Sequence, residues 1–149
     1  MVDSDTVIRM RGVIGKLARQ LNTSATGEGL TPTQASVLGL ICGRGPLGIA
    51  ELVELEGLNP TMASRVVGKL TELGLIHRIP DPADARAARV EVTPAGKEVH
   101  HRIKARRAQV VSDCLDRLPV RTTQTLLEAL PALEALAEEL RTTEAATKS

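Results

Sequence analysis

Apolar residues recur at steps of three and four positions near the start of the chain. Over residues 4–22 they are Val7, Met10, Ile14, Leu17 and Leu21. This spacing places all five on one face of an α-helix. The polar stretch NTSATGEG, residues 22–29, then predicts a loop.

Three later helices are predicted by the way they begin, with a capping residue followed by proline. The pairs are Thr31-Pro32, Asn59-Pro60 and Thr93-Pro94. A threonine or asparagine side chain accepts a hydrogen bond from the first turn, and proline fits the first helical position because an N–H there has no intrahelical partner. Gln34 completes a capping box. We expect these helices over about 32–44, 60–73 and 94–118.

Between the second and third of these helices the pattern changes to short alternating runs. Residues 75–79 and 88–92 flank the turn-rich segment DPADAR and predict a β-hairpin. A short helix closed by Gly57 is expected before the second helix. A last helix is expected over about 121–141, where Pro131 should introduce a kink, and the tail TTEAATKS is expected to be disordered.

This order of elements predicts a mainly α fold with a small β-hairpin wing. Residues 28–96 would form a winged helix-turn-helix DNA-binding core. Residues 1–27 would form an N-terminal dimerisation helix, and residues 97–149 a long linking helix followed by a C-terminal dimerisation helix. The two ends carry apolar faces for which the core offers no surface, so we expect them to build a homodimer.

Composition and charge narrow the classes of partner. Phe, Tyr and Trp are absent, which argues against aromatic stacking on unpaired bases. No apolar run approaches the ~20 residues of a membrane span, and the N-terminus lacks the apolar segment of a signal peptide, so we expect a cytoplasmic protein without a membrane partner.

Residues 59–107 hold ten Lys or Arg and five Asp or Glu, although the whole chain carries only +1. A phosphate-binding segment and a solvated basic face both fit that distribution.

The helix over 60–73 supplies candidate DNA contacts. Its outward positions include Thr61, Ser64, Arg65 and Lys69, whereas Ala63, Val66, Val67, Leu70 and Leu73 are expected to face inward. A helix enters the major groove with its N-terminal residues, where Arg65 could pair with a guanine edge and the hydroxyls could reach phosphates or bases. An ordinary amphipathic surface helix is the alternative.

The hairpin makes the DNA hypothesis more specific. Arg86 lies near its tip, where a minor groove would attract an inserted arginine, and Asp84 could orient that side chain. A loop salt bridge is the alternative for this pair. A candidate groove helix joined to a basic hairpin by Gly74 alone favours double-stranded DNA binding.

Residues 30–96 resemble the winged-helix core of the MarR family of bacterial transcriptional regulators. The similar segments are LTPTQASVL, NPTMASRVVGKLTELGLIHR and DPADARAARVEVTPAG. The resemblance implies a homodimeric regulator, a repressor by expectation, on a pseudo-palindromic operator with half-sites one helical turn, ~34 Å, apart. It assigns DNA contacts to Thr61, Ser64, Arg65 and Lys69, and it makes Arg86 the wing arginine and Asp84 its partner. Ala85 and Gly68 depart from the family's pattern, which often has a basic residue at the first position and a longer one at the second.

The family is often controlled by small phenolic or lipophilic effectors, by cysteine oxidation or by metals. Cys42 and Cys114 are far apart in helical surroundings and are expected to be buried free thiols. His100 and His101 would point about 100° apart on a helix, which disfavours a shared metal ion. We expect no cofactor and no metal, and the sequence leaves open a small effector bound among aliphatic side chains.

Two other classes of protein are the alternatives to a DNA-binding regulator. A winged-helix protein–protein interaction module would dock the 60–73 helix on a protein, and its DNA binding would be absent or insensitive to salt. An enzyme would need a nucleophile–base pair, a phosphate-cradling loop or a metal cluster. None is indicated, and GRGPLG lacks the lysine of a P-loop. We therefore expect no enzymatic activity.

Overall fold

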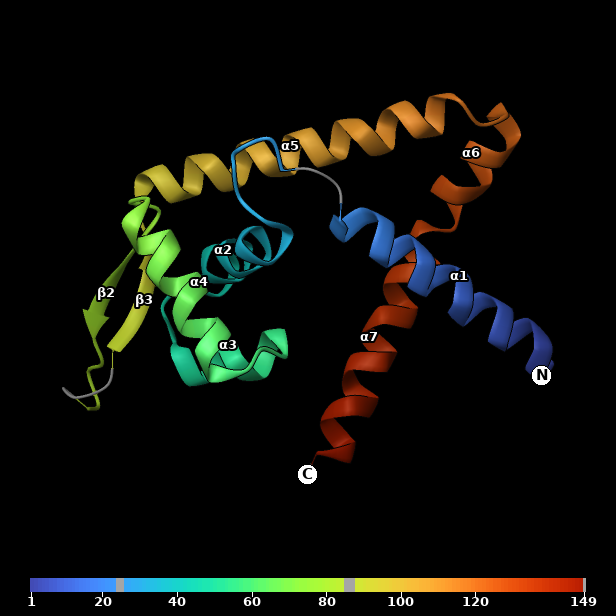
Figure 1. The fold of residues 1–149 in the computed structure, drawn as a ribbon. Coiled ribbons are helices and arrows are strands. Elements are labelled where there is room, and N and C mark those ends of the chain that lie inside the picture. The colour runs from blue at the N-terminus through green and yellow to red at the C-terminus, as the bar shows by residue number, and fades with distance from the viewer. Residues whose placement is uncertain (24–25, 85–87, 149) are drawn as a thin grey trace. The chain divides into compact units, whose positions relative to one another are not determined.

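The computed structural model describes residues 1–23, 26–84 and 88–148 (Figure 1). The chain divides into two compact units, residues 1–108 and 109–149. In chain order the elements are α1 (Ser4–Thr23), α2 (Pro32–Arg44), β1 (Leu47–Gly48), α3 (Ile49–Glu56), α4 (Pro60–Glu72), β2 (Ile76–Pro80), β3 (Ala88–Val92), α5 (Pro94–Asp116), α6 (Val120–Glu128) and α7 (Leu130–Thr147). The predicted mainly α fold with a small hairpin is confirmed.

Hydrogen bonds at three helix starts confirm the predicted caps. The Thr31 hydroxyl accepts a hydrogen bond from the Gln34 backbone N–H at 3.2 Å, and the Gln34 side chain accepts one from the Thr31 N–H at 2.9 Å. The Asn59 side chain accepts from the Met62 N–H at 2.8 Å. The Thr93 hydroxyl accepts from the Gly96 N–H at 3.0 Å. Each cap satisfies a backbone donor that would have no partner inside its helix.

The core of the first unit is aliphatic. Its fully buried large side chains are Leu38, Ile41, Leu52, Leu70, Ile76, Val37, Val67 and Val90. They come from α2, α3, α4 and the sheet, so the three central helices and the hairpin share one apolar interior. Burying each such side chain stabilises the fold by about 1.5–3 kcal/mol before entropy is counted. The inner side chains of α4 therefore anchor this helix to the core.

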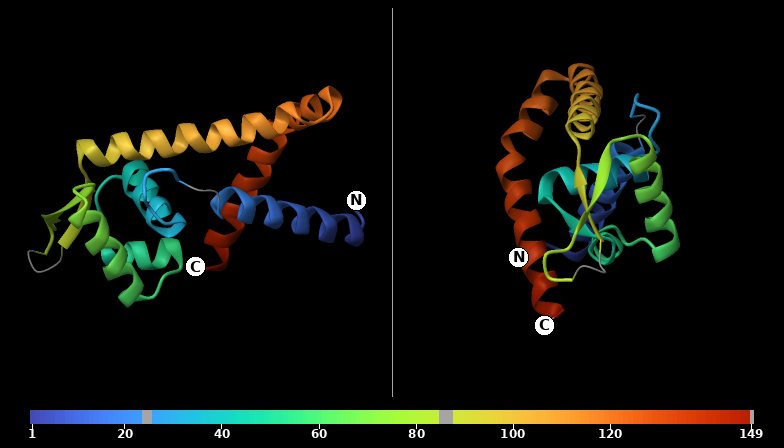
Figure 2. Two further views of the ribbon diagram at one scale, coloured as in Figure 1. Left: turned by 45° about the horizontal axis from the view of Figure 1, so that its top comes forward. Right: turned by 90° about the vertical axis from the view of Figure 1, so that its left-hand side faces the viewer.

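A three-stranded antiparallel sheet with the order β1-β3-β2 carries the wing. Figure 2 shows β2 and β3 as a narrow ribbon in the turned views. In the hairpin, Ile76 pairs with Val92 and Arg78 pairs with Val90. The third strand, β1, was not predicted, because two residues are too few to show an alternating pattern.

Thr93 closes the base of the hairpin. Its hydroxyl donates a hydrogen bond to the Gly74 carbonyl at 2.7 Å, and its backbone N–H donates to the Leu75 carbonyl at 3.0 Å. Gly96, in the first turn of α5, packs so closely on the Leu75 carbonyl that a Cβ atom would collide with it. The end of α4, the first wing strand and the start of α5 are therefore held together at one point.

The second unit corrects two predictions. A single kinked helix was expected over 121–141, but the structure has two helices, α6 and α7, that meet at Ala129. Pro131 lies in the first turn of α7, where proline costs no hydrogen bond, and this favours a break over a kink. The prediction of a disordered tail is wrong, because α7 continues through the tail as far as Thr147. Local interactions hold it, among them an ion pair between Lys148 and Glu144 at 2.9 Å. Across the described ranges, no helix is long and apolar enough to cross a membrane.

Candidate nucleic-acid interface

Helix α4 presents one buried and one exposed face. Its inner side chains, Ala63, Val66, Val67 and Leu70, are at most 7% exposed. The outer positions, Thr61, Ser64, Arg65, Gly68 and Lys69, are all exposed. The predicted division of the helix is confirmed except at Leu73, which is 46% exposed. The helix ends at Glu72, and Leu75 is buried in place of Leu73 because the chain turns at Gly74.

The polar groups of this outer face have no partners in the part of the chain that the structure describes. Arg65 and Lys69 form no ion pair there, and the Thr61 and Ser64 hydroxyls form no hydrogen bond. Asn59 caps the helix that carries them, which leaves the Thr61 N–H as the first-turn donor without an intrahelical partner, and this donor and the helix dipole favour an anion at this end. Hydroxyls, amide donors and two unneutralised cations are the groups that contact phosphates and base edges.

The structure describes the hairpin turn as far as Asp84. The Asp81 side chain accepts a hydrogen bond from the Ala83 N–H at 2.8 Å, and Asp84 is exposed. Across the strands, His77 and Glu91 pair at 2.9 Å. Arg86, and with it the expected contact to Asp84, lies outside the described residues.

Arg78, which the sequence pattern did not single out, is an exposed cation on the first strand of the hairpin. Directly paired strand residues lie on the same side of a sheet, so Arg78 shares the face of Val90 and of Ile76, two positions away. Ile76 is buried, and α4 packs against β2, whereas Arg78 is exposed further along the strand. Its side chain therefore lies on the same side of the hairpin as Ile76, nearer the turn. Strand alternation from Ile76 could have indicated it.

A Gly68→Ala substitution is expected to stabilise the protein and weaken DNA binding. Gly68 lies in the middle of the exposed face of α4, and a Cβ there would meet nothing within 4 Å. Replacing a mid-helix glycine should raise the free energy of unfolding by about 0.5–1 kcal/mol. The added methyl group would obstruct a close approach of the helix backbone to DNA. Thermal unfolding and duplex titration measure the two effects.

Gly43→Ala is the matched control, because Gly43 is exposed on α2 and a Cβ there also meets nothing within 4 Å. It should leave duplex affinity unchanged. Equal affinity for Gly68→Ala and the parent protein would show that the α4 backbone does not approach DNA closely at this position.

The cysteines and histidines do not form a second site in the described ranges. Both cysteines are free; Cys42 is half-buried, but Cys114 is exposed in this chain, contrary to prediction. Burial raises the pKa of the Cys42 thiol, which disfavours the reactive thiolate. His101 is exposed, whereas the half-buried His100 ring lies against Gly39 of α2, and this burial lowers its pKa. No group of three or more potential metal ligands occurs among residues 1–23, 26–84 and 88–148.

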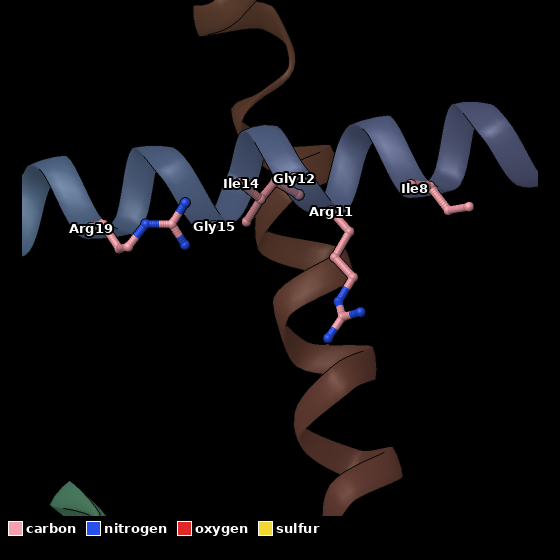
Figure 3. A pocket seen from close by; sticks show the side chains of 6 residues that line it. All are labelled: Ile8, Arg11, Gly12, Ile14, Gly15 and Arg19. Atoms are coloured by element: carbon pink, nitrogen blue, oxygen red, sulfur yellow. The ribbon is translucent and has the colours of Figure 1, made fainter.

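A hollow of about 530 Å³ lies along α1 (Figure 3). It is lined by Ile8, Arg11, Gly12, Ile14, Gly15 and Arg19. All six residues come from one helix, so no second element closes the hollow around a small molecule. It is a surface depression beside two glycines, where the helix backbone is exposed.

The exposed face of α4, followed by a two-stranded hairpin, defines a winged helix-turn-helix DNA-binding protein. Comparisons with known proteins agree. The sequence profile of the MarR family matches residues 28–87. A helix-turn-helix transcriptional regulator of Mycobacterium bovis is 26% identical over 141 residues, which cover 93% of this chain and 99% of that protein.

Two further proteins extend the comparison. The transcriptional repressor MdtR of Bacillus subtilis is 24% identical, covering 95% of this chain and 89% of that protein. The crystal structure of a probable transcriptional regulator from Pseudomonas aeruginosa aligns with a TM-score of 0.60 and 31% identity, covering 82% of this chain and 95% of that chain. Residues 28–87 of the chain therefore belong to the MarR family. The protein is a DNA-binding transcriptional regulator and not an enzyme.

Proposed function

We propose that the protein represses transcription by binding a pseudo-palindromic operator as a homodimer. The observation that carries the proposal is the exposed outer face of α4, where Thr61, Ser64, Arg65 and Lys69 have no partners in the described chain. In each half-site α4 would enter the major groove, and Arg86 with Asp84 would engage the adjacent minor groove. Repression is supported by the relative MdtR, which is a repressor.

The apolar surface of the terminal segments supports the dimer. In α1, Val7, Ile8, Met10, Val13, Ile14, Leu17 and Leu21 are all at least 39% exposed. In α6 and α7, Val120, Leu126, Leu127, Leu130, Leu133, Leu136 and Leu140 are all at least 37% exposed. Apolar surface on this scale is typical of an interface. We therefore assign dimerisation to residues 1–27 and 97–149 and DNA binding to residues 28–96.

Fluorescence anisotropy across a salt series tests the proposal. The labelled duplexes are one selected from a random pool by the protein and a shuffled version of it. Tight binding that prefers the selected duplex and falls steeply with salt is expected, because phosphate contacts release counterions. Binding that is absent, or weak and indifferent to both sequence and salt, would contradict the proposal and favour a winged-helix module that binds protein.

An Arg86→Ala variant is expected to bind the selected duplex less tightly and to remain a dimer. A minor groove attracts an inserted arginine, so its loss should remove one contact per half-site. Anisotropy measures the affinity and sedimentation measures the mass. A variant that sediments as a monomer would show that position 86 supports the fold or the dimer instead of contacting DNA.

The finer part of the proposal is release from DNA by a small lipophilic or phenolic effector. Its support is membership of a family often controlled in this way. A series of simple phenols, titrated into the protein–duplex complex at fixed salt, tests it. Release of duplex by an intact dimer is expected, and a complex unaffected by every compound in the series would contradict phenolic control.

A further inference from the structure

Met62 is an exposed apolar side chain in the first turn of α4. It is 47% exposed, whereas Val66, Val67 and Leu70 of the same helix are at most 7% exposed. Met62 is also absent from the side chains that form or flank the aliphatic core. Core packing therefore does not explain an apolar residue at this position.

The position of Met62 aligns it with the candidate DNA contacts. Residues 62, 65 and 69 follow one another at steps of three and four, so Met62 stands on the same edge of α4 as Arg65 and Lys69, one turn closer to the N-terminus. Its backbone N–H is fixed by the Asn59 cap at 2.8 Å. The N-terminal residues of a groove helix are those that contact base edges.

In the major groove, the apolar feature that distinguishes one base from the others is the C5-methyl group of thymine. A thioether side chain is flexible and polarisable, so it can pack on a methyl group without demanding one geometry. We propose that Met62 is a specificity-determining residue that contacts a thymine methyl group in each half-site, beside the base contacted by Arg65. This inference rests on the proposed operator binding.

The test removes only the methyl group. In a duplex selected by the full-length protein, each thymine is replaced in turn, symmetrically in both half-sites, by deoxyuridine. Loss of one buried methyl should weaken binding about fourfold per half-site, or about tenfold or more for the dimer. At one symmetric thymine pair, the parent protein should bind the deoxyuridine duplex more weakly by this factor. Met62→Ala should bind the thymine duplex and the deoxyuridine duplex equally.

Leu73→Ala is the matched control. Leu73 caps the C-terminal end of α4 and is similarly exposed, at 46%, but it lies eleven residues further along, about 16 Å from Met62 at the rise of an α-helix. It should retain the full sensitivity to deoxyuridine. Met62→Gln, similar in length but polar, should lose the sensitivity as Met62→Ala does, and circular dichroism checks that each variant is folded.

The outcomes separate this inference from the proposed function. A parent protein with no sequence preference would contradict operator binding itself. A parent protein that selects a duplex but tolerates deoxyuridine at every position would overturn the role of Met62 alone. So would a Met62→Ala variant that keeps the parent's sensitivity at the same thymine pair, or a Leu73→Ala variant that loses it.

Discussion

Leu133→Glu is expected to convert the dimer to a monomer and to abolish tight operator binding. Leu133 lies near the start of α7 and is 45% exposed in the single chain, among the apolar residues assigned to the dimer. Burying a glutamate in an apolar interface costs several kcal/mol unless it is paired or protonated. An acidic residue near a helix N-terminus does not weaken the helix, so the effect should fall on association.

The loss of affinity for DNA should be large because the two half-sites are contacted by linked subunits. When one subunit is bound, the second binds its half-site in an intramolecular step, which can add a factor of 10²–10⁴. Sedimentation should report the mass of one chain, and anisotropy should report the fall in affinity. The helix content measured by circular dichroism should stay at the parent's value.

Thr142→Glu provides the matched control for this variant. Thr142 is exposed on α7, and nine residues from Leu133 place it on the opposite side of the helix. It adds the same charge and should remain a dimer. A dimeric Leu133→Glu protein would refute the assignment of α7 to the interface.

Arg65→Ala is expected to weaken binding to the selected duplex by about 1–3 kcal/mol and to relax base preference at one position per half-site. Arg65 is exposed on the outer face of α4 and has no ion-pair partner in the described chain. Its removal therefore leaves no carboxylate unpaired there, and the effect should appear in DNA binding rather than in stability. Selection from a random duplex pool measures the base preference.

Arg65→Lys and Lys69→Ala separate base recognition from charge. Lysine keeps the charge but lacks the planar fork that pairs with guanine, so Arg65→Lys should lose base preference while retaining salt-dependent binding. Lys69→Ala should weaken binding to all duplexes similarly and reduce the salt slope by about one per half-site, or about two for the dimer. Unchanged base preference in Arg65→Ala would remove Arg65 from the residues that contact bases.

Local chemistry explains why much of the fold was predictable from the sequence. Thr31, Asn59 and Thr93 begin their helices with hydrogen bonds that depend only on neighbouring residues. The two faces of α4 follow from helical period alone, with one exception. The exception is Leu73. The helix ends before the turn at Gly74, so Leu75 is buried and Leu73 is exposed, which helical periodicity alone cannot predict.

The remaining differences have similar causes. Pro131 disfavours a continuous helix, but whether the chain kinks or stops depends on the helix ends that result. Disorder was expected for the tail as a chain terminus, yet its threonine hydroxyls donate hydrogen bonds to carbonyls of the same helix, as Thr143 does to Glu139 at 2.9 Å. In the candidate site, exposure of Thr61, Ser64, Arg65 and Lys69 was predictable, but Arg78 required the strand register. Their contacts with DNA stay predictions.

The closed base of the hairpin has a consequence for the operator. Thr93 bonds to both Gly74 and Leu75, so the two ends of the hairpin are tied together directly after α4. In the proposed complex, α4 and the hairpin would then meet two adjacent grooves at a set spacing. A duplex whose twist or groove width does not match the spacing between α4 and the hairpin would have to deform on binding. The free energy of that deformation depends on base pairs that no side chain contacts. Operator choice would then depend partly on DNA mechanics.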